Sequence, residues 1–232
     1  MTRPVVAIDG PAGAGKTTAS RALARRLGFA HVDTGAMYRA VGILAEERGV
    51  ALDDDAALAQ LVAGLSFELA EGGERLLVRG AGPVSGTSGR DLSDAIRGPH
   101  AGELASRVST RPAVRERLVA LQRDLGAGGG IVMEGRDIGT VVFPDAAAKL
   151  FLTASEDTRA TRRINERGGV DDELGRELAA RDSKDSQTNP PAPAPGAVEI
   201  DTEYKDVRRV LDEALKIVRA AAAAANQPEV AE

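Results

Sequence analysis

The sequence lacks several residue types on which whole classes of function depend. It has no cysteine, which excludes disulfides and thiolate metal sites, and its two histidines make a histidine-based zinc site unexpected. Aromatic residues make up only 3%, and tryptophan is missing, so a surface that stacks the bases of single-stranded nucleic acid is not expected. No apolar run reaches the roughly 18 residues of a membrane helix, and the N-terminus lacks the plan of a signal peptide. We therefore expect a cytoplasmic protein that contacts neither a membrane nor a nucleic-acid polymer.

The length of the chain and its charge narrow the class of protein further. At about 150 residues per domain, 232 residues predict one large domain or one domain with inserts. Apolar residues make up 43%, enough for a buried core. The 30 basic residues are outnumbered by 35 acidic ones, which argues against bulk binding to polyanions but leaves room for a local basic pocket.

Short apolar runs alternate with segments of helical spacing. The runs are nearly continuous in apolarity, as in parallel strands that are covered on both faces: Pro4–Ile8, Phe29–Val32, Ile131–Met133, Leu150–Thr153 and Val198–Ile200. Apolar residues at helical spacing lie within 19–27, 114–125 and 207–218. This alternation predicts an α/β fold with a mainly parallel sheet.

Two stretches interrupt the alternation. Ser66–Leu69 and Arg75–Arg79 resemble the two strands of a hairpin, and they lie in a segment of about 64–100 that we interpret as an insert. The second stretch, Asn165–Ala180, is highly charged and indicates a mobile helical lid. We expect a single domain whose core comprises 1–63, 101–164 and 181–232, with the insert at about 64–100 and the lid at about 165–180.

A phosphate-binding motif follows the first predicted strand. Residues 10–17 read Gly-Pro-Ala-Gly-Ala-Gly-Lys-Thr, which fits G-x-x-x-x-G-K-[ST] in full and opens the first predicted helix. Glycines let successive N–H groups turn toward phosphate oxygens, and the helix N-terminus favours an anion. Lys16 can reach the β- and γ-phosphates, and the Thr17 hydroxyl can bind Mg²⁺. The expected ATP-binding residues are Gly10, Pro11, Ala12, Gly13, Ala14, Gly15, Lys16, Thr17 and Thr18.

A carboxylate ends the third predicted strand. Ile131, Val132 and Met133 are followed directly by Glu134, an arrangement in which the acid can hold a water molecule on Mg²⁺. We therefore expect Thr17 and Glu134, the latter through water, at the metal.

The remaining motifs favour a kinase over a nucleotide-dependent switch. There is no N-K-x-D guanine-binding motif, and the D-x-x-G match at 172–175 lies in the charged lid, where chance explains it better. Arginine, whose planar fork suits phosphate, recurs near predicted strand ends and lid edges. These arginines are Arg39, Arg115, Arg136, Arg159, Arg162, Arg163 and Arg181.

Several blocks of the sequence together resemble the bacterial cytidylate kinases over nearly the whole chain. The most specific are Asp33–Arg39, which reads D-T-G-A-M-Y-R, and Glu134–Asp145, which reads E-G-R-D-I-G-T-V-V-F-P-D; Ile200-Asp201-Thr202 also matches. The resemblance implies transfer of the γ-phosphoryl group of ATP to CMP or dCMP. It also implies a three-layer P-loop fold with a five-stranded parallel sheet in the order 2-3-1-4-5, an acceptor-binding insert with a small antiparallel sheet, and a helical lid.

The resemblance also implies roles for individual residues. Thr34 and Arg39, helped by Arg136, would contact the CMP phosphate. Cytosine would be read by Ser106, Arg115 and Asp137, and the ribose would be contacted by Arg181 and Asp185. The lid-side arginines that close over the transferred group would be Arg159, Arg162 and Arg163.

One position departs from the family pattern. The family usually has an arginine three residues after the position of Asp185, whereas this chain has Thr188 and a proline-rich stretch after it. Two alternatives remain open at this stage: another P-loop kinase of a small metabolite, and a non-catalytic nucleotide-binding regulator. We expect a monomer that acts on the small molecules CMP or dCMP and ATP.

Overall fold

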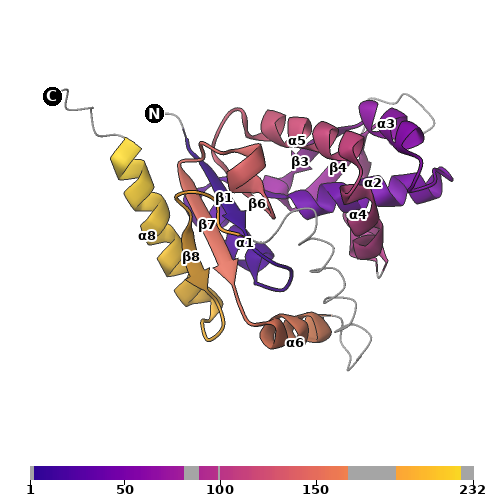
Figure 1. Cartoon of the computed structure of the whole chain (residues 1–232). Coiled ribbons are helices and arrows are strands. Elements are labelled where there is room, and N and C mark those ends of the chain that lie inside the picture. The colour runs from indigo at the N-terminus through magenta and orange to yellow at the C-terminus, as the bar shows by residue number, and fades with distance from the viewer. Residues whose placement is uncertain (1–2, 81–88, 99, 167–191, 226–232) are drawn as a thin grey trace. The chain divides into compact units, whose positions relative to one another are not determined.

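The computed structural model describes residues 3–80, 89–98, 100–166 and 192–225 (Figure 1). The chain divides into two compact units. Unit 1 comprises the residues up to Phe29 and from Gly129 onward, and unit 2 comprises Ala30–Gly128. The expected lid from residue 167 onward lies outside the described residues, as does Thr188. Within the described part of the chain, no helix combines the length and the apolar character needed to cross a membrane.

The large sheet has five strands in the order β2-β6-β1-β7-β8. Counted along the chain, these five strands have the order 2-3-1-4-5, so the expected topology is confirmed. Their bounds are β1 Val5–Asp9, β2 Ala30–Asp33, β6 Ile131–Gly135, β7 Ala148–Thr153 and β8 Val198–Asp201. Within unit 1, β1 pairs in parallel with β6 and β7, and β7 pairs in parallel with β8.

Two helices cover one face of the unit 1 strands (Figure 1). They are α1, Lys16–Leu27, and α8, Val207–Ala225. Alternate strand residues such as Val6, Ile8 and Leu150 pack against their apolar stripes. Ala7, between Val6 and Ile8, is also fully buried, which explains why β1 is continuously apolar rather than alternating. The described part of unit 1 also contains η3 Ile138–Val142 and α6 Glu156–Glu166.

The second strand begins one residue later than Phe29–Val32, the range expected from the sequence. Gly28 adopts the left-handed conformation after α1, and the Phe29 N–H donates to the carbonyl of Ala24 at 2.9 Å. This pair of features is a Schellman cap, so the backbone of Phe29 belongs to the end of the helix. Arg3 also covers the Phe29 ring, with its guanidinium 5.2 Å from the ring centre.

Unit 2 is built on helices that the sequence patterns only partly revealed. Besides the short η1 of the insert, its helices in the described residues are α2 Thr34–Glu47, α3 Asp55–Ala63, η2 Ala95–Arg97, α4 Ala101–Ser109 and α5 Pro112–Gly126. The stripe expected at 114–125 became α5, which begins at Pro112 and ends at Gly126. Gly42 lets α2 approach α4 closely, because a Cβ there would lie 2.6 Å from that of Leu104.

The insert contains the expected hairpin. Its described residues form the strands β3 Ser66–Ala70, β4 Arg75–Arg79 and β5 Arg90–Asp91, with the short helix η1 Glu71–Gly73 at the turn. The order is β3-β4-β5, and both pairs are antiparallel. The small antiparallel sheet predicted for 64–100 is therefore present.

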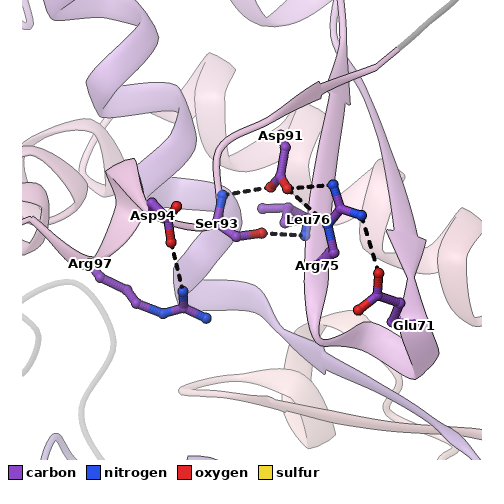
Figure 2. Close-up of polar contacts among 7 residues, drawn as sticks. All are labelled: Glu71, Arg75, Leu76, Asp91, Ser93, Asp94 and Arg97. Atoms are coloured by element: carbon purple, nitrogen blue, oxygen red, sulfur yellow. Dashed lines mark hydrogen bonds and ion pairs between the residues drawn. The ribbon is translucent and has the colours of Figure 1, made fainter.

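Polar contacts fix the end of this small sheet (Figure 2). Arg75 pairs with Asp91 at 2.7 Å on the next strand and with Glu71 at 3.1 Å in the turn. Ser93 accepts from the Leu76 N–H at 3.1 Å, and its own N–H donates to Asp91 at 2.9 Å. Hydrogen bonds from Ser93, followed by that from Arg75, lower the pKa of Asp91 to about 2.

Candidate active site

The phosphate loop, residues 10–17, connects the carboxyl end of β1 to the N-terminus of α1 in unit 1. Two of its glycines are required by the local packing. Gly10 has a φ of 147°, and a Cβ there would overlap the carbonyl oxygen of Leu152. Gly13 has a φ of 75°, and a Cβ there would lie 2.7 Å from the carbonyl oxygen of Arg159. The loop therefore runs against β7 and α6 where no side chain fits.

The loop combines three features that attract anions. The first helical residue of α1 is Lys16, so the N–H groups that have no acceptor within the helix and the positive end of the helix dipole lie where the loop ends. The Lys16 ammonium group folds back over the loop and donates to the carbonyl of Pro11 at 2.7 Å. A loop of backbone donors with a lysine at its helix end can bind the phosphates of a nucleotide.

Two hydroxyl groups of α1 bind the carboxylate of Glu134, the acid in β6. Thr17 donates to Oε2 at 3.0 Å, and Ser20 lies 3.0 Å from Oε1. The glutamate side chain is buried, with 2% of the residue exposed. A buried carboxylate needs such donors, since burial without them would disfavour its charged form.

This hydroxyl–carboxylate pair fits a magnesium ion. The oxygens of Thr17 and Glu134 are the hard ligands that Mg²⁺ prefers, directly or through water. Within the described ranges, no three Asp, Glu or His side chains group closely enough to hold a metal ion by themselves. A Mg²⁺ ion at this point would therefore take its other ligands from water and from phosphate oxygens.

Asp9 ties the end of β1 to the segment that follows β6. Its two carboxylate oxygens accept from the N–H groups of Ile138 and Gly139, both at 2.8 Å. Burial raises the pKa of Asp9 to about 6, although these two hydrogen bonds act in the opposite direction. The contact fixes the backbone immediately after Arg136 and Asp137, two residues expected at the acceptor.

In unit 2, the start of α2 brings three residues of the Asp33–Arg39 block together. Asp33 is the N-cap of α2: its Oδ1 accepts from the Ala36 N–H at 3.1 Å, and its Oδ2 binds Arg39 Nη2 at 2.7 Å. Burial disfavours the charged form of Asp33, but the Arg39 guanidinium outweighs this and lowers the pKa of the acid. Thr34, the first residue of the helix, is buried. Arg39 is therefore held in place by its ion pair with Asp33.

The remaining expected residues of unit 2 lie on two neighbouring helices. Ser106 is buried on α4, and Arg115 is half-buried on the first turns of α5. Helix α2 packs against both of these helices. Unit 2 thus carries Thr34, Arg39, Ser106 and Arg115 on three mutually packed helices.

The expected lid-side arginines lie on α6. Arg159 is buried, and its Nη1 donates to the carbonyl of Ala12 in the phosphate loop at 3.1 Å. Arg162 donates to the carbonyl of Gly13 at 3.4 Å, whereas Arg163 is half-buried on the same helix. Arg181 and Asp185, expected at the ribose, lie outside the described residues.

Three residues that carry these contacts received no role from the sequence: Asp9, Ser20 and Asp33. Asp33 belongs to a block of the resemblance, which was the available signal. Ser20 follows Thr17 by three positions, so the two hydroxyls share a helix face. Helical spacing could have indicated Ser20 once Thr17 had been placed at a metal.

Comparison with known proteins identifies the relatives of the chain. A family model described as cytidylate kinase matches residues 6–220. A cytidylate kinase from Pelotomaculum thermopropionicum is 46% identical over 218 residues, covering 90% of this chain and 92% of that protein. One from Geobacter sulfurreducens is 44% identical over 223 residues, covering 93% and 92%. Among solved structures, a gluconokinase from Sinorhizobium meliloti matches with a TM-score of 0.51 at 15% identity over 97% of both chains, which supports the fold alone.

Proposed function

The chain belongs to the cytidylate kinase family, and from this premise we propose that it transfers the γ-phosphoryl group of ATP to CMP or dCMP, giving ADP and CDP or dCDP. The observation that carries the proposal is the family match over residues 6–220, together with a complete phosphate loop whose Thr17 binds Glu134. The similarity to a gluconokinase gives no reason to choose a sugar as acceptor, because at 15% identity it reflects the fold.

On the donor side, the phosphate loop binds the ATP phosphates through its backbone N–H groups. Lys16 exchanges its bond to the Pro11 carbonyl for the β- and γ-phosphate oxygens, where its charge offsets the charge of the transferred group. Thr17 and Glu134 would hold Mg²⁺, which supplies further positive charge to the same phosphates. The low exposure of Glu134 keeps its carboxylate aimed at this point rather than at solvent.

On the acceptor side, we assign the CMP phosphate to Thr34, Arg39 and Arg136. Arginine suits this role because its planar fork binds two phosphate oxygens at once. Asp33 holds one arm of the Arg39 fork at 2.7 Å, which orients the remaining donors before the substrate arrives. The contacts of Arg181 and Asp185 with the ribose remain part of the proposal.

The choice of cytosine follows from complementary polar groups. Cytosine presents acceptors at O2 and N3, which suit Arg115 and Ser106, and an amine at N4, which suits the carboxylate of Asp137. Uracil has a carbonyl in place of that amine and a protonated N3, so UMP would leave Asp137 without a donor and would turn an N–H toward the group that donates to N3. Unpaired polar groups of this kind produce large differences between substrates.

The transfer itself requires position and charge rather than a strong base. The attacking oxygen of a nucleoside monophosphate is already ionised, so no proton has to be removed before attack. The catalytic groups are therefore those that align the two phosphates and offset the charge between them. Both proposed substrates are small cytoplasmic metabolites, and we propose that a monomer of the chain acts on them in the cytoplasm.

A panel of acceptors tests the proposal. ADP release should be measured by a coupled assay with ATP and each of CMP, dCMP, UMP, AMP, shikimate and gluconate. The proposal predicts the highest kcat/KM with CMP or dCMP. A higher kcat/KM with any acceptor that lacks cytosine would refute it, and nucleotide binding without acceptor-dependent ADP release would identify a non-catalytic regulator.

A further inference from the structure

Four consecutive carbonyl groups of the phosphate loop each accept a hydrogen bond from a side chain. The donors come from three different parts of unit 1, and only one of them belongs to the loop itself. The pairs are Lys16 with Pro11 at 2.7 Å, Arg159 with Ala12 at 3.1 Å, Arg162 with Gly13 at 3.4 Å, and Thr202 with Ala14 at 3.1 Å. The Thr202 hydroxyl shares its one hydrogen between Ala14 and the carbonyl of Thr153, which lies 2.9 Å away.

This pattern has a physical cause. When successive N–H groups of a loop turn inward toward an anion, the carbonyls of the same peptide groups turn outward. Carbonyls that are covered by other elements must find donors, or the loop loses stability in that conformation. The outward bonds therefore help to set the direction in which the inward N–H groups point.

Two of the donor residues, Thr202 and Arg162, are themselves held by further hydrogen bonds. Thr202 is 3% exposed, and its N–H donates to the carbonyl of Thr153 at 2.8 Å, where β8 ends beside β7. Arg162 binds Thr202 twice, at the carbonyl oxygen at 2.7 Å and at Oγ1 at 3.0 Å. These bonds join α6 to the segment after β8 directly behind the loop.

A neighbouring acid fixes the start of α6. Glu203 accepts from the Ser155 N–H at 2.7 Å, from the Ser155 hydroxyl at 2.8 Å and from the Thr158 hydroxyl at 2.5 Å. These bonds lower the pKa of Glu203, so it stays charged at the N-terminus of the helix. Arg159 lies one residue after Thr158 and is 7% exposed, so its guanidinium has little freedom to leave Ala12.

We propose that Arg159, Arg162 and Thr202 are positioning residues that orient the phosphate loop from its outer side, through its carbonyl groups. This assigns Arg159 and Arg162 a role different from the closure over the transferred group that the resemblance implies. It also gives a role to the Ile200-Asp201-Thr202 block. The inference rests on the proposed function only in that the loop binds the donor phosphates.

The most selective test is a pair of variants at Thr202. Thr202→Val keeps the shape of the side chain but removes the hydroxyl, whereas Thr202→Ser keeps the hydroxyl. Tripolyphosphate is the probe of the loop alone, because it has neither base nor ribose. Its Kd should be measured by calorimetry beside that of CMP, and KM and kcat should be measured for ATP.

For Thr202→Val we expect the Kd of tripolyphosphate and the KM for ATP to rise about tenfold, the effect of one ordinary hydrogen bond. The Kd of CMP should change by less than about twofold, and Thr202→Ser should restore the affinity for tripolyphosphate. If Thr202→Val fails to fold, Arg162→Met takes its place in the test. This variant keeps the apolar stem of the side chain and should show the same selective loss of affinity for tripolyphosphate.

Two results would overturn the inference. One is wild-type affinity for tripolyphosphate in folded Thr202→Val and Arg162→Met proteins. The other is an equal loss of affinity for CMP and tripolyphosphate, which would indicate a general loss of structure. Tripolyphosphate binding does not depend on the acceptor. If the wild-type protein bound tripolyphosphate but did not phosphorylate CMP, the proposed function would be refuted, and the Thr202 variants would still test this inference.

Discussion

The hydroxyl group of Thr17 lies 3.0 Å from the carboxylate of Glu134, although 117 positions separate the two residues in the sequence. The bond joins the first turn of α1 to β6, at the ends of parallel strands where ligands of open α/β sheets bind. Four predictions follow from this and neighbouring contacts.

The first concerns Glu134 and magnesium. Glu134→Gln keeps an acceptor for Thr17 but removes the charge that would hold a water on the metal. We expect the Mg²⁺ concentration for half-maximal activity to rise about 10- to 100-fold. This is the usual effect of removing a residue that contacts a metal through one of the metal's ligands. A Mg²⁺ titration of ADP release measures this. Ser20→Ala is the matched control, since it removes the other hydroxyl beside Glu134 and leaves the carboxylate in place.

An unchanged Mg²⁺ titration in Glu134→Gln would contradict the assignment of this residue to the metal. If Ser20→Ala showed the same shift as Glu134→Gln, the effect would come from the geometry of the carboxylate and not from its charge.

The second prediction concerns Asp33 and the acceptor phosphate. Asp33→Asn keeps an oxygen for the cap of α2 but breaks the ion pair with Arg39. We expect the KM for CMP to rise about tenfold while the KM for ATP stays within about twofold, because Arg39 loses its orientation and the donor loop is untouched. Steady-state kinetics with each substrate varied in turn measures the two values.

Asp54→Asn is the control for this change, because Asp54 caps α3 by the same kind of bond, to the Ala57 N–H at 2.9 Å. It should leave both KM values unchanged. A similar rise in the KM for CMP in both variants would show that a weakened cap, rather than the freed Arg39, is responsible.

The third prediction concerns Asp137 and the base. Asp137→Ala should lower the ratio of kcat/KM for CMP to kcat/KM for UMP by about tenfold or more, since the partner of the cytosine amine is gone. Both acceptors are measured in the same coupled assay. Asp212→Ala, which removes an exposed acid on α8, should leave the ratio unchanged. If Asp137→Ala kept the wild-type ratio, Asp137 would not be a base-reading residue.

The fourth prediction concerns Asp9 and pH. Its pKa is raised from 3.8 to about 6 by burial, so the folded state holds a proton that the unfolded state releases at lower pH. The favourable contribution of this proton is complete below about pH 3.8 and is lost as the pH rises through about 6. The free energy of unfolding of Asp9→Asn, relative to wild type, should therefore increase by about 1 to 2 kcal/mol between pH 5 and pH 7.

Urea denaturation of both ligand-free proteins at several pH values measures this difference. Any constant penalty of the amide, which can accept at only one of its two terminal atoms, cancels when values at different pH are compared. A difference that does not vary with pH would mean that Asp9 does not hold a proton in this range.

Much of the core could be predicted because its signals are local. The phosphate loop is eight consecutive residues. Each of β1 and β6 contains a short apolar run that an acid follows, Asp9 in β1 and Glu134 in β6. The hairpin of the insert was equally clear, since two strand-like runs flank a turn that contains two glycines. Such patterns reflect the backbone of one segment and need no knowledge of its partners.

Helix α2 and the contacts around the loop were missed for different physical reasons. Buried residues occur almost all round α2, from Ala36 to Ala45, so no polar face marks it as a helix. The bonds of Arg159 and Thr202 to the loop join residues 147 and 188 positions apart, and only the paired strands bring them together. Arg159 was expected to contact phosphate itself, whereas in the structure its guanidinium donates to a carbonyl of the loop that we propose as the phosphate site.

The most direct test of the account is a crystal structure with CMP and a non-hydrolysable ATP analogue bound together. It should show the β-phosphate of the analogue inside the loop of residues 10–17 and the CMP phosphate on Arg39 and Arg136, with the cytosine amine facing Asp137. A site filled by the protein's own side chains, or CMP bound with its base away from Asp137, would contradict the account.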